Sequence, residues 1–580
     1  MTNKDFRRID AIRSNQGPIA NHVIDEFVAG RLSRRSFISR GTIIGLSVPT
    51  IGALIAACSD DKKTGTTTDT TPGTGTAVTT PATKGGTLKV AGALPSSASA
   101  LLDPVAVNDG PGLTLLSQFG QYLTISQADL TLKGSLATEW TPNADASEWT
   151  FKLNPAAKFS DGSPVTADDV VASIERLIKP ENKSNSLSAF ATGKLSPGGV
   201  TAKDAGTVVF KLNGPMGNFP YIVSSDNYNS IILPKTVTDT TNFAKDVIAG
   251  KIATSGPWTI AKYDATTGIT FAPNPNYWGS LNLEGLEYIF YSDTTAAMAG
   301  FQSGEVDALV KFEVADGTSL FDNKDVTVYE LKSSNHRQIH LRCSEGPFKD
   351  KRIRQALAMS IDRQKMVDSL FSGKASIAND TPFFDVYPSS GTRPDSKFDV
   401  AAAKALVTEA GGGFDVDMYG ITYYEAPDLA VLIQSAGKEI GININIKLQD
   451  DYYDKNWVRT YDPSVPGSNI GITDFGHRGV PDVYLNAPLR SFKSLDDGAG
   501  VWNAAEFANA DYDAAVDTYS SAADLQSQQK AAETIQGILQ DEVPMLIPYN
   551  INYLAATKSN VTGVVPTAMG HFFTDQASKA

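Results

Sequence analysis

The chain has 580 residues, too many for one ordinary hydrophobic core, so two or three lobes are expected. Hydrophobic residues make up 41% and charged residues 20%, which is typical of a soluble globular protein. The formal net charge is −14; residues 1–57 carry eight Lys/Arg against four Asp/Glu, so the part from Cys58 onward is near −18. This balance argues against nucleic acid as a partner, because phosphate recognition needs clustered positive charge.

Residues 1–57 carry the parts of an export signal: a charged region, a short apolar region and small residues at the end. The paired Arg34 and Arg35, with Phe37 two residues on, resemble the twin-arginine export motif. Glycine and proline interrupt the apolar stretch over 41–57, which favours a signal over the alternative, a permanent membrane-spanning helix. We therefore predict export by the twin-arginine route.

Cys58 ends this stretch, and residues 55–58 resemble a bacterial lipobox, in which the cysteine is acylated. The alternative for Cys58 is a small buried apolar residue. Residues 59–84 are almost all Thr, Gly, Asp, Lys, Pro and Ala, a composition that predicts a flexible tether. We predict a signal peptide over 1–57, then a lipidated cysteine and tether over 58–84, which anchor the protein to the outer face of the cytoplasmic membrane.

From residue 85 onward the pattern is that of a folded body in which strands and helices mix. Alternating apolar residues predict strands at 87–91, 149–153, 207–212 and 442–446, and an apolar run predicts one at 545–547. Helical periodicity and end signals predict helices at 167–177 (with Thr166 as N-cap), 356–371, 401–410, 429–440 and 523–539. The fold class is therefore α/β.

Few residues suggest catalysis or metal binding. Cys343 follows an apparent strand and is predicted to be a small core residue; a disulfide within the chain would need an unacylated Cys58. His336 and His340 are four apart on that strand, without the intervening Glu of a zinc-protease motif. The sequence has no nucleophile elbow, P-loop or dinucleotide fingerprint. We expect no enzyme activity, no metal site and no cofactor.

A series of short motifs, in order along the body, resembles family 5 of the bacterial solute-binding proteins, the oligopeptide-, dipeptide- and nickel-binding receptors. The motifs are Ser135–Trp140 with Trp149–Leu153, Phe159–Val170, Thr254–Trp258, Asn274–Gly279, Gln302–Asp307, Pro347–Leu357 with Ile361–Arg363, Glu409–Gly411, and Asp541–Met545. Most of these residues have structural interpretations, such as the turn at Asp161-Gly162. Arg352, Arg354, Asp362 and Arg363 are predicted to form a solvated face of one helix start.

The resemblance implies a large, two-lobed, periplasmic-binding-protein-like fold of type II, with three sequence regions and a hinge between the lobes. Domain I would comprise 85–125, 252–335 and 545–580, domain II 126–251, and domain III 336–544. The implied function is that of a monomeric substrate-binding lipoprotein of an ABC importer. It would capture a peptide or similar-sized solute between the lobes and deliver it to the membrane permease and its ATPase.

The resemblance also implies ligand contacts in the strand-to-loop segment over 471–485, in the third sequence region. In peptide-binding relatives an acidic residue at the start of this loop pairs with the ligand's amino terminus, and Asp474 is the matching position. A buried ammonium group needs such a partner charge. The alternative for Asp474 is a turn residue bonded to its own backbone. The loop departs from the usual pattern through 476–480, which stand before Pro481 and add charge.

Arg478 has two interpretations that the sequence leaves open. Its guanidinium could hold a ligand carboxylate with two parallel hydrogen bonds, or it could pair with Asp474 or Asp482 when no ligand is bound. Tyr453 and Trp457 are cleft candidates because aromatic side chains give large contact area with few rotors; core packing is their alternative. The segment Asn108-Asp109-Gly110, in the loop after the first strand, is a further cleft candidate. The predicted ligand-binding residues are Asp474, Phe475, His477, Arg478, Trp457, Tyr453 and Asn108.

Other functions are compatible with the same sequence. The same fold could bind an oligosaccharide or a metal chelate in place of a peptide. A membrane-anchored hydrolase or a surface sensor without a transport role belongs to a different class.

Overall fold

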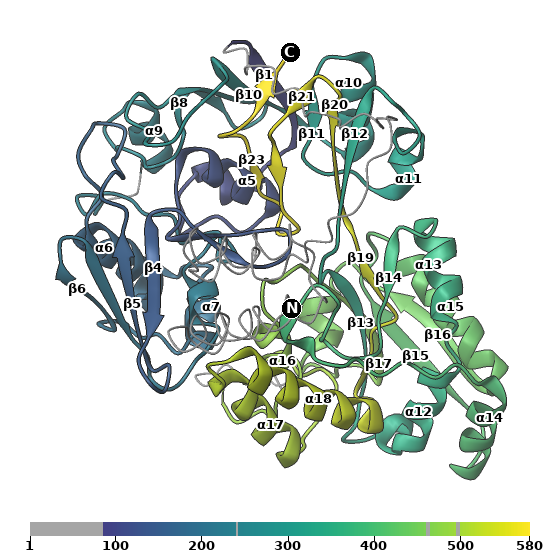
Figure 1. Cartoon of the computed structure of the whole chain (residues 1–580). Coiled ribbons are helices and arrows are strands. Elements are labelled where there is room, and N and C mark those ends of the chain that lie inside the picture. The colour runs from purple at the N-terminus through teal and green to yellow at the C-terminus, as the bar shows by residue number, and fades with distance from the viewer. Residues whose placement is uncertain (1–84, 239–241, 460–463, 495–498) are drawn as a thin grey trace, which may run out of the picture. The chain divides into compact units, whose positions relative to one another are not determined.

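Two seven-stranded sheets organise the part of the chain that the structure describes (Figure 1). The structure is a computed structural model, and it describes residues 85–238, 242–459, 464–494 and 499–580. The predictions for Arg34, Arg35 and Cys58 therefore lie outside the described residues.

The first large sheet contains strands from three separate stretches of sequence. Its order is β12 (Val326–Leu331), β20 (Tyr553–Lys558), β11 (Ala308–Leu309), β1 (Thr87–Ala93), β10 (Gly285–Tyr291), β9 (Gly268–Pro273) and β8 (Trp258–Asp264). β1 is parallel to both of its neighbours, and the other pairs are antiparallel. Helices pack against it: α5 (Gly110–Phe119) and α9 (Phe243–Ile248) contact β8, and α10 (Thr294–Ser303) contacts β1.

A smaller antiparallel sheet forms from residues between β1 and β8. Its order is β4 (Ala137–Pro142), β5 (Glu148–Leu153), β7 (Thr207–Lys211) and β6 (Val200–Asp204). Its helix α6 (Ala167–Ile178) begins as predicted, because Thr166 and Asp169 form a reciprocal capping box. The helices α7 (Leu187–Thr192) and α8 (Phe219–Ile222) follow in the same stretch.

The second large sheet is built mainly from the third sequence region. Its order is β14 (Ala375–Ile377), β19 (Tyr549–Ile551), β13 (His336–Leu341), β17 (Ile470–Phe475), β15 (Phe414–Gly420) and β16 (Ile442–Leu448), and β18 (Met545–Leu546) pairs with β13. The helices of this region are α12 (Lys351–Met359), α13 (Arg363–Phe371), α14 (Val400–Glu409), α15 (Ala426–Glu439), α16 (Asp482–Asn486), α17 (Ala510–Ser521) and α18 (Leu525–Glu542).

Short strand pairs complete the described elements. β2 (Thr124–Ser126) pairs with β3 (Leu132–Gly134), β21 (Val561–Thr562) with β24 (Ser578–Lys579), and β22 (Val565–Pro566) with β23 (Phe572–Phe573).

The chain passes between the two large sheets at two adjacent points. Residues 332–335 connect β12 to β13, and Asn552 connects β19 to β20. The crossings are tied together, because Ser333 Oγ donates to the Ile551 carbonyl oxygen at 2.7 Å and the Ile551 N–H donates to the Asn335 carbonyl oxygen at 2.8 Å. A pair of short crossings between two separately packed lobes is a suitable place for a hinge.

The structure corrects the placement of residues 545–551. The sequence assignment put them in domain I, but β18 and β19 pair with β13 and β14 of the second large sheet. The chain returns to the first sheet only at β20, beyond the crossing at Asn552. An apolar run that pairs as a strand carries no sequence signal of which sheet it joins.

The predicted helix 356–371 is wrong in its continuity. The structure has two helices there, because the Asp362 side chain accepts a hydrogen bond from the Lys365 N–H and starts α13 afresh. The predicted solvated face is also wrong in part: Arg354 and Arg363 are only 3% and 5% exposed. Arg352 does lie at the surface, where it pairs with Asp350.

Candidate functional site

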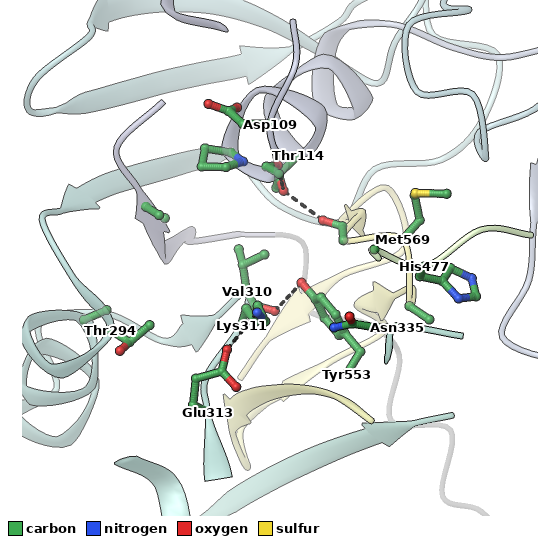
Figure 2. A pocket seen from close by; sticks show the side chains of 18 of the residues that line it. Asp109, Thr114, Thr294, Val310, Lys311, Glu313, Asn335, His477, Tyr553 and Met569 are labelled. Atoms are coloured by element: carbon green, nitrogen blue, oxygen red, sulfur yellow. Dashed lines mark hydrogen bonds and ion pairs between the residues drawn. The ribbon is translucent and has the colours of Figure 1, made fainter. Parts of the chain in front are cut away.

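A cavity of about 520 Å³ lies where the first large sheet, the crossings and the 474–477 segment meet. The first sheet contributes its lining through Ala91, Tyr288 and Tyr553, and α5 contributes Thr114. Figure 2 shows the side chains of this cavity, with Asp109 and Thr114 on one side and Lys311, Glu313 and Tyr553 on another. The volume suits a small organic ligand or a short peptide segment.

Asp474 brings a carboxylate into this cavity from the end of β17. Its Oδ1 accepts hydrogen bonds from two phenol groups, that of Tyr453 at 2.5 Å and that of Tyr423 at 3.0 Å. Burial and the neighbouring Asp474 raise the pKa of Tyr423 to about 12, so its phenol stays a donor. Within the described residues Asp474 makes no ion pair, so no side-chain cation within 4 Å neutralises its charge.

The basic residues of the cavity are already paired. Lys311 Nζ lies 2.8 Å from Glu313, and Arg337 Nη2 lies 2.9 Å from Glu425. Burial alone would lower the pKa of Lys311, but Glu313 outweighs it and the pKa is raised. Arg337 also stacks on the ring of Tyr424, 4.8 Å from its centroid.

The charged residues that line the cavity favour a cationic group. Four of them are acidic, Asp109, Asp293, Glu313 and Asp474, and two are basic, Lys311 and Arg337. The lining therefore carries a formal charge of −2, since four acids face two bases. Asp109 and Asp293 are engaged as the N-caps of α5 and α10. This leaves Asp474 as the carboxylate best placed to meet a ligand.

His477 also lines the cavity, in the loop after β17. Its Nδ1 accepts a hydrogen bond from the Ser334 N–H at 3.0 Å, so in the neutral ring the proton is on Nε2. Burial, with Arg478 beside it, lowers the pKa of His477 to about 3. The imidazole is therefore neutral at physiological pH and offers one N–H donor.

The structure separates Asp474 from Arg478. Arg478 lines a second, smaller cavity of about 280 Å³, together with residues of the 221–229 segment. It makes no ion pair with Asp474 or Asp482 in the part of the chain described. Asp482 is buried and accepts hydrogen bonds from Asn218 Nδ2 at 2.8 Å and Ser520 Oγ at 3.1 Å. Of the interpretations left open for Arg478, pairing with these acids is wrong for this conformation.

The other predicted site residues lie around the cavity and not on its wall. Phe475 is buried and stacks on the His336 ring at 5.3 Å, as a core residue does. Tyr453 acts through its bond to Asp474, and Trp457 packs on Tyr453 with ring centroids 4.9 Å apart. The Asn108 side chain bonds Ser96 at 2.9 Å, whereas its neighbour Asp109 reaches the cavity.

Several cavity residues were not identified from the sequence. Lys311, Glu313 and Tyr424 carry no motif, and their positions depend on β11, α11 (Val314–Gly317) and α15 coming together around the crossings. Met569 comes from the C-terminal segment, more than 450 residues from Asp109 in sequence. The candidate segment Asn108-Asp109-Gly110 does reach the cavity, through Asp109 and Gly110 and not through Asn108.

Two further observations concern other kinds of site. Across the described ranges, no group of three or more His, Cys, Asp or Glu side chains is arranged to hold a metal ion. Among the helices that the structure describes, none is long and apolar enough to span a membrane.

The fold matches a known class of two-lobed, mixed α/β periplasmic binding proteins. A family model described as "Bacterial extracellular solute-binding proteins, family 5 Middle" matches residues 131–476, more than half of the chain. The chain belongs to this family, and it has the family's solute-binding role. The resemblance inferred from the ordered motifs is confirmed.

Individual relatives agree with this assignment. The murein peptide-binding protein MppA of Escherichia coli is 24% identical over 470 residues, which cover 77% of this chain and 84% of MppA. A probable D,D-dipeptide-binding protein, DdpA of the same organism, is 29% identical over 279 residues, but these cover 47% of this chain and about half of DdpA, 53%.

Solved structures agree in fold. The open, unliganded form of MppA has a TM-score of 0.70 at 20% identity, over 86% of this chain and 97% of its own. The substrate-binding protein CtaP of Listeria monocytogenes has a TM-score of 0.72 at 21% identity, over 86% of this chain and 99% of its own. These similarities confirm the two-lobed fold.

Proposed function

We propose that this protein is the substrate-binding component of an ABC importer and that its solute carries a protonated amine, a peptide being the preferred class. Asp474 carries this proposal: its carboxylate lines the main cavity and is held by two tyrosine hydroxyls. It forms no close ion pair among the described residues, because Arg337, which lies opposite it on β13, is paired with Glu425. A ligand ammonium would supply the missing charge. The formal charge of −2 on the cavity lining also favours a cationic ligand.

The names of relatives support peptides without deciding the solute. MppA is named for murein peptide, the GsiB proteins of Salmonella for glutathione and DppE of Bacillus subtilis for dipeptides. Others are named for heme or solved with a nickel–histidine complex. A metal chelate is thus the second candidate. The neutral His477 on the cavity wall could donate a hydrogen bond from Nε2–H to such a chelate. The family is one of transport proteins, so we propose no catalytic role.

The three-region division and the hinge belong to the same proposal. Domain I would be based on the first large sheet, domain II on the four-stranded sheet and domain III on the second large sheet. One crossing lines the main cavity through Ser333 and Asn335, and Ile551 and Tyr553 line it on either side of the other crossing. A solute bound there would therefore lie against the hinge. Binding of the solute would then directly favour closure of the lobes. The protein would act as a monomer and present its closed form to the permease.

A direct titration tests the amine. Tri- to pentapeptides with a free amino terminus are expected to bind at least about 30-fold more tightly than the same peptides N-acetylated, because acetylation removes the charge that Asp474 would pair. Calorimetry measures the affinity, and small-angle scattering of the same samples should show compaction with the free peptides alone. Equal affinity for both series would refute the amine. Binding of a nickel–histidine complex in place of the peptides would support the second candidate, a metal chelate.

We also propose that the protein is a lipoprotein exported by the twin-arginine route, on the basis of Arg34, Arg35 and Cys58. A Cys58→Ser variant is expected to move from the membrane fraction to the soluble extracytoplasmic fraction, because it loses its acyl anchor. An Arg34→Lys/Arg35→Lys variant is expected to stay inside the cell. Fractionation with immunoblotting measures both, and membrane association that survives Cys58→Ser would contradict the anchor.

A further inference from the structure

The second cavity lies next to the first but has different walls. Its volume is about 280 Å³, and it is lined by α7, the 221–229 segment and residues from 478 onward. The loop after β17 separates the two cavities: Gly476 and His477 line the main one, and Arg478 and Gly479 line the second. One turn of backbone therefore presents side chains to two different spaces.

Two basic side chains in the second cavity form no close ion pair among the residues described. Burial lowers the pKa of Lys194, and the nearby charges of Asp517 and Asp482 oppose that shift without pairing with the lysine. Lys194 Nζ donates to the Pro215 carbonyl oxygen at 2.7 Å, and Arg478 Nη1 donates to the His477 carbonyl oxygen at 3.0 Å. Neither side chain makes an ion pair there, whereas Arg490 in the same cavity is paired with Asp517 at 2.8 Å. Lys194 and Arg478 therefore retain donors that a bound anion could occupy.

Asp226, whose charge interacts with that of Arg478, is a poor internal partner for it. Asp226 lines this cavity, yet its Oδ2 is buried and accepts no hydrogen bond in the described structure. The Asp226 carboxylate packs directly against Gly479, where there is no room for a side chain: an added Cβ would lie 1.7 Å from Oδ2. Burial raises the pKa of Asp226 to about 7, against the opposing effects of Ser126 and Arg478, so its negative charge is weakened near neutral pH.

The apolar part of the wall indicates an organic ligand. Ile222, Val480 and Trp502 line the cavity beside the two basic residues. A bare inorganic ion would leave this surface uncovered, whereas a carboxylate on a short carbon chain would cover it. The formal charge of the lining is +1, from Lys194, Arg478 and Arg490 against Asp226 and Asp517.

We propose that the second cavity is a binding site for a carboxylate-bearing organic anion, held by Arg478 and Lys194. This site contrasts with the main cavity, whose lining is acidic. The carboxylate belongs either to a separate small molecule or to the acidic end of the solute whose amine meets Asp474. The proposal does not require Asp474 to bind an amine, so the carboxylate site and the amine site can be tested independently.

Succinate is the probe, with the neutral succinamide as its isostere, titrated into the full chain by calorimetry. Succinate is expected to bind, and Arg478→Met and Lys194→Met are each expected to weaken it about tenfold or more, because each removes a charged donor. Arg478→Lys and Lys194→Arg are each expected to bind succinate more tightly than the matching methionine variant, since the charge is kept although the donor geometry changes. Lys211→Met, which removes an exposed lysine of β7 outside both cavities, is the matched control and should change nothing.

The outcomes separate clearly. Absence of saturable binding up to about 10 mM succinate, equal binding of succinamide, or full affinity in both methionine variants would overturn the proposal. An unchanged succinate affinity in Asp474→Asn is expected, and it keeps this test independent of the main cavity. Competition between succinate and a peptide already bound would assign the carboxylate to the end of the transported solute; simultaneous binding would assign it to a separate molecule.

Discussion

Replacing Arg363 by alanine is expected to lower the free energy of unfolding by about 3–5 kcal/mol, because it leaves a buried carboxylate without its cation. Arg363 and Asp380 form an ion pair in which both side chains are almost fully buried, 5% and 6% exposed. Burial raises the pKa of Asp380, and Arg363 opposes that shift. The guanidinium also donates to the Ala358 and Ile361 carbonyl oxygens at 3.2 and 3.3 Å.

Denaturant unfolding followed by circular dichroism measures this loss. The matched control is Arg352→Ala, in the helix just before, whose pair with Asp350 is exposed and should contribute less than about 1 kcal/mol. A double variant, Arg363→Met with Asp380→Asn, is expected to recover part of the stability, because no unpaired charge stays buried. Similar small losses for Arg363→Ala and Arg352→Ala would show that the buried pair does not act as described.

Replacing Asp474 by asparagine is expected to weaken binding of peptides with a free amino terminus by about 2–4 kcal/mol, roughly 30- to 1000-fold, because the charge that meets the ammonium is lost. The amide oxygen of asparagine can still accept the hydrogen bonds from Tyr453 and Tyr423, so the loop should keep its shape. The unfolding midpoint should therefore stay nearly constant. Affinity for N-acetylated peptides should change little.

Asp417→Asn is the matched control for this measurement. Asp417 is an exposed carboxylate on the neighbouring strand β15, where it accepts a hydrogen bond from Asn445 at 3.1 Å outside the cavity. Its replacement should leave peptide affinity unchanged. If Asp474→Asn and Asp417→Asn bind free peptides equally well, Asp474 is not the amine partner, and the solute must be recognised by other groups of the cavity.

Much of the fold could be predicted where local signals and tertiary structure agree. The strict alternation at 442–446 became β16, and the Thr166 capping signal became the start of α6. The break between α12 and α13 was missed, although Asp362 is itself a helix-capping residue type, because apolar periodicity continues across it. The burial of Arg363 was missed for a different reason: its partner Asp380 comes from a loop 17 residues away, which no pattern brings near.

The candidate site could be predicted only in part, for the same physical reason. Asp474 at the end of β17 and His477 just after it do line the main cavity. Arg478 is the next residue after His477, yet it lines another cavity, because the direction of each side chain in a loop depends on backbone angles that the sequence pattern does not give. Lys311 and Tyr424 reach the cavity through long-range packing alone.

The strand order of the first large sheet has a consequence for how the chain matures. β20, made of residues 553–558 near the C-terminus, is inserted between β12 and β11, and β11 in turn pairs with β1. Synthesis runs from the N-terminus, so β12 and β11 keep unpaired edges until residues 332–552 and β20 itself have also left the ribosome. Such late, long-range pairing slows folding and lengthens the time during which those edges can aggregate.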